Sequence, residues 1–123
     1  MKVVSWNCRG LGGMQKLEVI KRFKLMEIAS ILLIQETKKS AEDNIAIIKN
    51  IWPKGTGLAI SASGASGGIL CWWNSDKFEL RSAIENRNWI LIKLENKGSK
   101  EQFWIGNVYG PTMNLQKESF GHR

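Results

Sequence analysis

Apolar and polar positions divide this chain into a first part that alternates strands with helices and a second part made of short strands. Residues 2–8 are β-branched and aromatic, and residues 30–34 form a continuous apolar run, typical of a central strand covered on both faces. Between them, residues 15–29 have helical propensity and a broad apolar side. Because a helical crossover separates the two strands, we expect them to pair in parallel.

A second helix is predicted to begin after Ser40, where Asp43 follows at the spacing of a capping box, and to end at Pro53. Beyond it the pattern changes to short strands separated by turn residues, predicted at 58–62, 69–73, 78–84, 89–94 and 102–109. A long hairpin connection is expected through the Ser- and Gly-rich residues 61–68, and Asn114 is a candidate cap of a short final helix. The order predicts one α/β layered domain over residues 1–123 with a mixed sheet.

Composition narrows both the partners and the chemistry. The chain has 18 Lys plus Arg against 11 Asp plus Glu, a formal charge of +7, which favours nucleic acid as a partner and an anionic membrane surface second. It has one histidine, His122, and two aspartates, Asp43 and Asp76, so an Asp/His hydrolase site has few residues to use. Cys8 and Cys71 lie in separate apolar runs and are predicted to be buried, reduced thiols.

No segment has the apolar length of a secretion signal or of a membrane span. We therefore expect an intracellular protein, in the nucleus or the cytoplasm, without a membrane partner. Six tryptophans could stack on bases. Most lie in apolar strands and are predicted to pack in the core (Trp6, Trp72, Trp89 and Trp104), whereas Trp73 falls on the opposite strand face from Trp72 and is expected to be the most exposed.

Two residues stand out because each follows an apolar strand and precedes a loop. Asn7 ends the first strand and Glu36 follows the second. Ligands of open α/β sheets collect outside the carboxyl ends of the strands, where an amide and a carboxylate oxygen would suit Mg²⁺. The alternative is that Asn7 caps a turn and Glu36 is an exposed strand-end carboxylate. The residues alone leave these two interpretations level.

Tyr109 ends the last strand, in the sequence Asn-Val-Tyr-Gly-Pro. A phenol at that position can donate a hydrogen bond to a phosphate oxygen in the same crevice. Taken alone, a β-favouring aromatic with its hydroxyl at the rim of the sheet is the better interpretation.

Four blocks together resemble the endonuclease/exonuclease/phosphatase superfamily. They are, in order, Val-Val-Ser-Trp-Asn-Cys-Arg-Gly-Leu at 3–11, Leu-Leu-Ile-Gln-Glu-Thr at 32–37, Ser-Gly-Gly-Ile at 66–69 and Asn-Val-Tyr-Gly-Pro at 107–111. The first two resemble in particular the endonuclease domain of plant LINE-type (non-LTR) retrotransposons. The resemblance covers nearly the whole chain but only about the first half of that family's domain.

The resemblance implies a four-layer α/β sandwich of two mixed sheets with helices outside, of which this chain is the incomplete N-terminal portion. It implies that Glu36 is the principal ligand of Mg²⁺ (or Mn²⁺), that Asn7 lies beside it, and that Tyr109 contacts the scissile phosphate of DNA. The family's later Asp-x-Asn and Ser-Asp-His blocks do not occur in the chain. We therefore expect a fragment of a metal-dependent endonuclease that does not nick DNA alone.

Two other functions remain open. The chain could be a basic, non-catalytic nucleic-acid-binding module, whose binding would weaken steeply with salt. It could also derive from a phosphoesterase that acts on a phosphoinositide or another phosphomonoester. In either class, half a sandwich would leave one sheet face uncovered, so we expect exposed apolar side chains that favour self-association or pair with the missing half of the domain.

Overall fold

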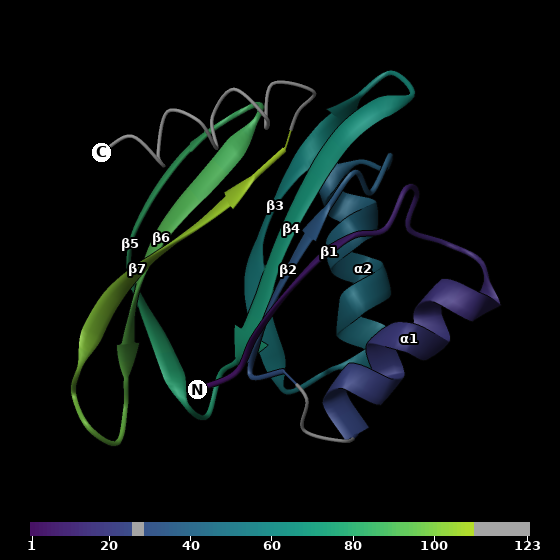
Figure 1. The fold of residues 1–123 in the computed structure, drawn as a ribbon. Coiled ribbons are helices and arrows are strands. Elements are labelled where there is room, and N and C mark those ends of the chain that lie inside the picture. The colour runs from purple at the N-terminus through teal and green to yellow at the C-terminus, as the bar shows by residue number, and fades with distance from the viewer. Residues whose placement is uncertain (26–28, 110–123) are drawn as a thin grey trace, which may run out of the picture.

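The computed structural model describes residues 1–25 and 29–109 as a layered arrangement of two helices and two sheets (Figure 1). The elements are β1 (Val3–Asn7), α1 (Met14–Leu25), β2 (Ile31–Gln35), α2 (Ala41–Ile51), β3 (Gly55–Ser63), β4 (Ser66–Asn74), β5 (Phe78–Asn86), β6 (Trp89–Asn96) and β7 (Gln102–Val108). The mixed α/β class predicted from the pattern is confirmed. The predicted cap Asn114 lies outside the described residues.

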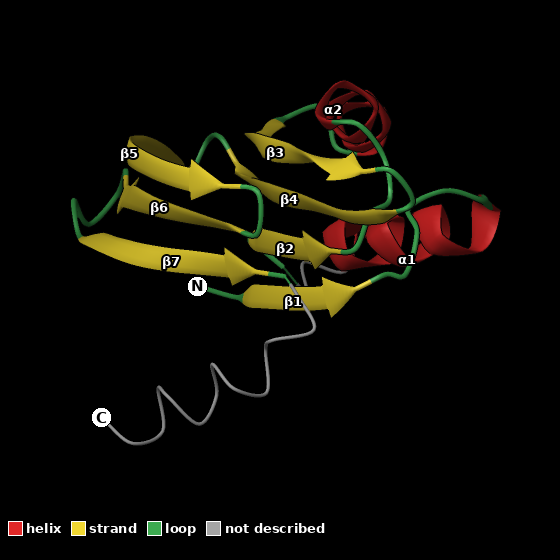
Figure 2. Ribbon diagram, turned by 90° about the horizontal axis from the view of Figure 1, so that it is seen from above, coloured by secondary structure: helices red, strands yellow, loops and turns green. Residues whose placement is uncertain are grey.

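The first sheet has the strand order β1-β2-β4-β3. β1 and β2 pair in parallel, as the helical crossover predicts, and β4 runs antiparallel to both β2 and β3. All five residues of β2 are buried, because helices cover one face of this sheet and the second sheet covers the other (Figure 2). The continuous apolar run of 30–34 therefore forms a strand covered on both faces, as predicted.

Both helices lie on the same face of the first sheet (Figure 1). At the start of α2, Ser40 Oγ accepts a hydrogen bond from the backbone N–H of Asp43 at 3.1 Å, which confirms the predicted cap. The structure describes α1 as far as Leu25, and residues 26–28 of the predicted helix lie outside the described residues. The core between helices and sheet contains residues of the loops, helices and strands alike: Cys8, Leu11, Ile20, Leu32, Ile34, Ile48, Trp52, Leu70 and Trp72.

The hairpin between β3 and β4 is tighter than the sequence suggested. Ser63 pairs with Ser66, so only Gly64 and Ala65 form the turn, and the expected long connection is wrong. The Ser- and Gly-rich composition instead belongs to the strands themselves. Gly64 has φ +63°, a left-handed conformation that glycine adopts without the steric cost of a side chain.

The second sheet has the order β5-β6-β7 with antiparallel neighbours, and it packs face to face on the first sheet. The core between the sheets includes Ile31, Ile69, Trp73, Ile90 and Ile92. Trp73 is only 1% exposed, so the prediction that it is the most accessible tryptophan is wrong. Its strand is central in a sheet buried on both faces, and strand alternation there separates two buried environments rather than core from solvent.

Trp104 also departs from the prediction, since it is 48% exposed instead of packed in the core. It lies on β7 between the inward-facing Phe103 and Ile105, on the outer face of the second sheet. Ile84 is half exposed on β5, at the position paired with Leu91. In the part of the chain that the structure describes, no helix covers this face, so three layers are present (Figure 2).

Candidate active site

Asn7 and Glu36 lie at the same edge of the first sheet. Asn7 is the last residue of β1 and pairs with Gln35, the last residue of β2, so Glu36 begins the loop directly beside it. The parallel pairing that the crossover predicted thus brings the two candidate ligands to neighbouring strand ends. Such an edge is where ligands of open α/β sheets bind.

The backbone pairing of β1 and β2 continues past the strands into their loops. Cys8 N donates to Gln35 O at 3.1 Å, Gly10 N to Glu36 O at 2.7 Å and Leu11 N to Thr37 O at 2.7 Å. Lys16 Nζ closes the first loop by donating to the carbonyls of Arg9 and Gly10 at 2.9 and 2.8 Å. The loops that carry the candidate residues are therefore held together by main-chain hydrogen bonds.

Strained backbone gathers at this edge. Arg9, Glu36 and Lys38 have φ values of +54°, +57° and +61°, in the left-handed region, and Lys100 is the only other described non-glycine residue with a positive φ. Such a conformation costs on the order of 1 kcal/mol per residue and persists only where the surroundings enforce it. Here the enforcing contacts are the loop hydrogen bonds, and the result is a sharp turn of the chain at Glu36.

The side chains of the two candidate ligands, Glu36 and Asn7, differ in whether they already form hydrogen bonds. Within the described residues, no hydrogen bond or ion pair involves the carboxylate of the half-buried Glu36. The Oδ1 atom of Asn7 accepts a hydrogen bond from the backbone N–H of Arg9 at 3.2 Å, which makes Asn7 the cap of a turn. The alternative interpretation of Asn7 is thus realised, and its oxygen keeps one lone pair for a second partner.

Tyr109 reaches the same loops through a pair of glycines at the start of β4. A Cβ added to Gly67 would lie 3.8 Å from Cε2 of the Tyr109 ring, so the ring rests beside this glycine. The carbonyl of Gly67 accepts from Lys38 N at 2.8 Å, and that of Gly68 accepts from Thr37 N at 3.0 Å. A Cβ on Gly68 would meet Thr37 Oγ1 at 2.2 Å. The Ser-Gly-Gly-Ile block therefore connects the tyrosine to the loop that follows Glu36.

A buried polar cluster joins the two sheets directly beneath these residues. Asn107 on β7 is 1% exposed, and its Nδ2 donates to the carbonyls of Ile34 at 3.2 Å and Leu70 at 3.0 Å in the first sheet. Its Oδ1 accepts from Gln35 Nε2 at 2.7 Å, and the same nitrogen also reaches Ser5 Oγ at 3.0 Å. We call the pair Gln35 and Asn107 the intersheet clamp.

Both residues of the clamp are close in sequence to a candidate site residue. Gln35 immediately precedes Glu36, and Asn107 precedes Tyr109 by two residues, which places both on the same face of the extended chain. Tyr109 N in turn donates to Asn88 O at 2.8 Å, which holds the tyrosine backbone against the β5–β6 turn. The clamp therefore fixes the position of the second sheet, and of Tyr109, relative to Glu36.

The two thiols near this region are neutral structural groups. Burial raises the pKa of Cys8, whose Sγ donates to the carbonyls of Gln35 and Glu36 at 3.5 and 3.6 Å. Burial also raises the pKa of Cys71 to about 12, against the opposing effect of a hydrogen bond from Asn107. Because thiolates and not thiols are nucleophiles and metal ligands, neither cysteine contributes to the site chemistry. The sequence-based prediction of buried, reduced thiols is confirmed.

The side chains at this edge offer oxygen donors, the type of ligand that a hard divalent cation prefers. Glu36 offers an unengaged carboxylate and Asn7 an amide oxygen, and Mg²⁺ is commonly held by one or two carboxylates together with several waters. No group of three or more His, Cys, Asp and Glu side chains that could hold a metal occurs in residues 1–25 and 29–109. The described residues thus fit one corner of a magnesium site and leave most of the coordination to water or to phosphate oxygens.

The fold has clear counterparts among solved structures, although no protein-family model and no curated protein matches the chain. An endonuclease/exonuclease/phosphatase from Bacteroides vulgatus aligns with a TM-score of 0.65 at 15% identity, over 86% of this chain and 51% of that one. The 3′ phosphatase NExo from Neisseria, bound to a product DNA hairpin, aligns with a TM-score of 0.65 at 16% identity, over 98% and 49%. The chain has the endonuclease/exonuclease/phosphatase fold and spans about half the length of these structures.

A third structure, TDP2 from D. rerio complexed with a single-strand DNA product, aligns with a TM-score of 0.57 at 14% identity, over 94% of this chain and 51% of that one. The fold predicted from the resemblance is thereby confirmed, and the partial coverage agrees with an incomplete domain. The described helices are too short or too polar to cross a membrane.

Sequence reasoning identified Asn7, Glu36 and Tyr109, and the structure brings all three to one edge. It missed the roles of Gln35 and Asn107. A signal was present, because Phe103, Ile105 and Asn107 share one face of a strand by alternation, and an asparagine on an apolar face needs a buried partner. The identity of that partner, however, depends on how the two sheets pack.

Proposed function

We propose that this chain is the N-terminal part of a metal-dependent endonuclease that hydrolyses DNA phosphodiester bonds. The observation that carries the proposal is the unengaged carboxylate of Glu36 beside Asn7 at the carboxyl ends of a parallel strand pair, in an endonuclease/exonuclease/phosphatase fold. The Ser-Trp-Asn-Cys-Arg-Gly-Leu and Gln-Glu-Thr-Lys blocks support the LINE-type retrotransposon endonucleases as the source within that superfamily.

In this proposal Glu36 and Asn7 hold Mg²⁺, or Mn²⁺ in its place. The ion, when bound, stabilises negative charge on the phosphate and on the leaving oxygen. Tyr109 donates its hydroxyl to a phosphate oxygen, its ring lies beside Gly67, and the clamp joins the end of its strand to the first sheet. The exposed cations of the surrounding loops, Arg9 and Lys38, attract the DNA backbone to this edge.

Within the described residues, no group of three or more His, Cys, Asp and Glu side chains gathers at this edge to complete a metal centre. We therefore propose that the chain binds metal weakly and does not nick DNA alone. The water-activating groups of the family would come from the second half of the domain.

Metal binding tests the first part of the proposal. Titration of Mn²⁺ into the 123-residue chain, followed by paramagnetic broadening of backbone NMR signals, should broaden residues 7–9 and 36–38 first. Glu36→Gln should abolish this selectivity, whereas Glu101→Gln, an exposed carboxylate in the β6–β7 turn, should leave it unchanged. Broadening that is the same in the Glu36→Gln variant would refute the metal assignment.

Plasmid nicking tests the second part. We expect no Mg²⁺-dependent conversion of supercoiled to nicked plasmid above the background of the Glu36→Ala variant. Nicking that requires Mg²⁺ and disappears in Glu36→Ala would show that the chain is a complete nuclease and would overturn the claim of inactivity.

A non-catalytic nucleic-acid-binding module is the second candidate, and the absence of a three-ligand cluster in the described residues favours it. Under this alternative, DNA affinity falls steeply with salt but does not respond to Glu36→Gln or to Mg²⁺. A phosphoesterase acting on a phosphoinositide or another phosphomonoester would share the metal edge. It would be recognised by hydrolysis of such a substrate when the complete domain is assayed.

A further inference from the structure

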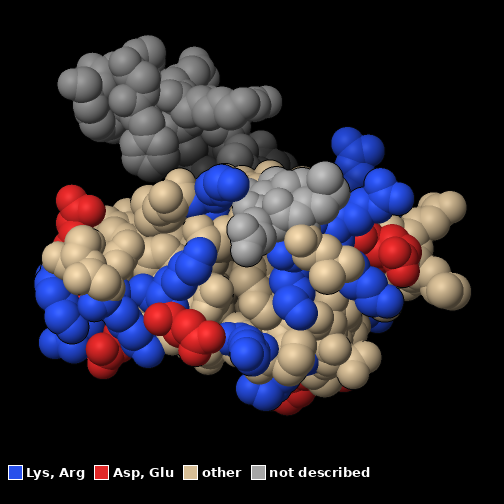
Figure 3. All heavy atoms as spheres, turned by 90° about the horizontal axis from the view of Figure 1, so that it is seen from below, with Lys and Arg blue, Asp and Glu red and all other residues tan. Residues whose placement is uncertain are grey.

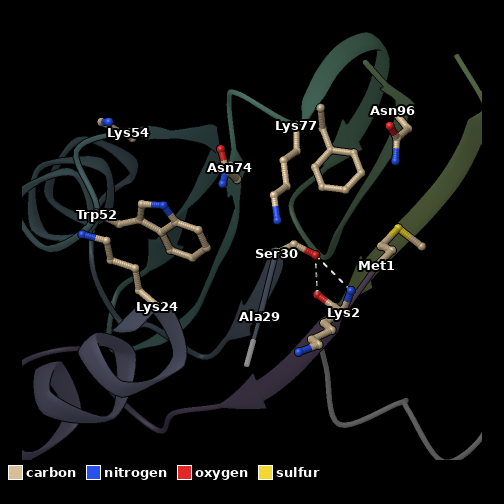
Figure 4. Close-up of a pocket in the computed structure, with 11 residues that line it drawn as sticks. Met1, Lys2, Lys24, Ala29, Ser30, Trp52, Lys54, Asn74, Lys77 and Asn96 are labelled. Carbon is tan, nitrogen blue, oxygen red and sulfur yellow. Dashed lines mark hydrogen bonds between the residues drawn. The ribbon is translucent and has the colours of Figure 1, made fainter. Parts of the chain in front are cut away.

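A second polar site lies at the opposite end of the sheets from Glu36. A pocket of about 430 Å³ opens where β1 and β2 begin, β4 ends and β5 starts. Lysines from three separate segments line it: Lys24 from α1, Lys54 from the α2–β3 loop and Lys77 from the β4–β5 turn. Lys2 and Ser30, which are joined by hydrogen bonds of 2.9 and 3.1 Å, form another wall (Figure 4).

No carboxylate of the described residues lines this pocket. Three carboxylates are adjacent in sequence to lining residues, Asp76, Glu79 and Glu95, and all three lie outside the lining. Figure 3 looks onto this end of the molecule and shows Lys and Arg side chains spread over it, with fewer acidic groups between them. The electrostatic environment of the pocket is therefore positive, and its walls favour an anion.

Two asparagines in the pocket wall present donors and not acceptors. Asn74 Oδ1 accepts from the backbone N–H of Asp76 at 2.8 Å, and Asn96 Oδ1 accepts from Gly98 N at 2.9 Å and Ser99 N at 3.2 Å. Because a backbone N–H can only donate, these bonds fix which side-chain atom is oxygen and which is nitrogen.

With their oxygens bound in the turns, both amide nitrogens face the pocket (Figure 4). Within residues 1–25 and 29–109, no acceptor bonds either nitrogen. Lys77 extends between Asn74 and Ser30 toward the same space (Figure 4). Lysine ammonium and amide N–H groups thus converge on a cavity that offers donors on several sides.

We propose that this pocket binds a phosphate group, with Asn74 and Asn96 donating hydrogen bonds and Lys24, Lys54 and Lys77 balancing the charge. A tetrahedral oxyanion matches such a donor set because its oxygens accept several hydrogen bonds at once. The phosphate belongs either to a nucleic-acid strand that crosses this end of the sandwich or to a small phosphate ester. The proposal is independent of the metal edge, since the two sites lie at opposite ends of β1 and β2.

Asn96→Asp is the informative variant. Aspartate keeps an oxygen for the turn but replaces the amide donor with a negative oxygen, so the fold is preserved and the anion is repelled. Asn86→Asp is the matched control, because Asn86 Oδ1 accepts from Asn88 N and Trp89 N in the same kind of turn at the other end of the β5–β6 hairpin. Both variants change the net charge equally.

The test follows the side-chain amide NMR signals of the ¹⁵N-labelled chain during titration with inorganic phosphate and, separately, with a ten-nucleotide single-stranded DNA. We expect phosphate to shift the signals of Asn74 and Asn96. Asn96→Asp and Lys77→Gln should each weaken binding about tenfold, the loss of one charged hydrogen bond. Asn86→Asp should change it less than about twofold, and Glu36→Gln should have no effect.

The two ligands separate the two sources of phosphate. Equal weakening of phosphate and oligonucleotide by Asn96→Asp assigns the pocket to the nucleic-acid backbone. Weakening of inorganic phosphate alone assigns it to a small phosphate ester. The proposal is overturned if phosphate shifts neither asparagine signal, or if Asn86→Asp weakens binding as much as Asn96→Asp does.

Discussion

Asn107 offers the sharpest test of how the two sheets are held together. Its side chain is buried between them and makes three hydrogen bonds to nitrogen and oxygen atoms of the first sheet: with Gln35 Nε2 at 2.7 Å, Leu70 O at 3.0 Å and Ile34 O at 3.2 Å. A longer hydrogen bond joins Asn107 Nδ2 to Cys71 Sγ at 3.6 Å. Asn107→Leu keeps a side chain of similar size and removes all of these bonds. The variant therefore separates the polar contribution of the clamp from simple packing.

The magnitude follows from these contacts. A hydrogen bond contributes about 1 kcal/mol net, so three account for about 3 kcal/mol of the free energy of unfolding. The penalty for an unpaired buried donor is not added, because Gln35 Nε2 retains Ser5 Oγ at 3.0 Å and Leu33 O at 3.3 Å. For a chain of this length, a loss of about 3 kcal/mol lowers Tm by roughly 10 °C.

Urea denaturation followed by tryptophan fluorescence measures this loss, provided that the transition is two-state. Asn50→Leu is the control, because Asn50 is exposed on α2, and it should shift the free energy of unfolding by less than about 1 kcal/mol. An Asn107→Leu chain within about 1 kcal/mol of the parent would show that the clamp does not stabilise the packing of the sheets, and the reasoning would fail.

Asn107→Asp adds a pH dependence of known sign. An aspartate buried beside the carbonyls of Ile34 and Leu70 cannot donate to them when ionised, so its folded-state pKa lies above its unfolded value of about 3.9. The unfolded state then ionises first, and stability falls as pH rises from the unfolded to the folded pKa. We expect the variant to be most stable relative to the parent at low pH. A deficit independent of pH would contradict a buried carboxyl group.

Three further outcomes follow from the structure. Gly68→Ala should lower the free energy of unfolding by more than about 2 kcal/mol, because φ is +90° and Thr37 leaves no room for a Cβ. Gly64→Ala is the control and should cost about 1 kcal/mol, because a Cβ there meets nothing within 4 Å. Thiol labelling with a disulfide reagent at pH 8 should be slow in the native chain and release two equivalents in urea, since Cys71 has a pKa of about 12 and burial raises that of Cys8. Trp104→Ser should reduce concentration-dependent association in sedimentation velocity, because the ring is half exposed. The free energy of unfolding should fall by no more than about 1 kcal/mol. Unchanged association would show that the chains contact one another elsewhere.

Local patterns determined most of the fold correctly. The crossover between two apolar runs predicted the parallel β1–β2 pair, and the Ser40 cap and Pro53 bracket α2. Each of these features depends on residues close together in the sequence. The edge that carries Asn7 and Glu36 followed from the same reasoning, because parallel strands joined by one helix must end at the same side of the sheet.

The errors share a different cause. Trp73 and Trp104 were assigned from the alternation of their own strands, but burial depends on what packs against each face. Trp73 faces a second sheet that the sequence pattern did not place, and Trp104 faces outward from it. The clamp was missed for the same reason, since Gln35 and Asn107 are 72 residues apart and meet only when the sheets pack.

The position of the candidate residues is therefore determined within the described part of the chain. Glu36 and Asn7 are held by main-chain bonds between two loops, and the backbone of Tyr109 is held by its hydrogen bond to Asn88 O, with its ring beside Gly67. If the proposed function is correct, weak metal binding by this chain reflects too few ligands and not a loose geometry. NMR signals of residues 7–9 and 36–38 should then be sharp and single before metal is added. Exchange broadening confined to these loops in the metal-free chain would show instead that the site needs additional residues in order to form.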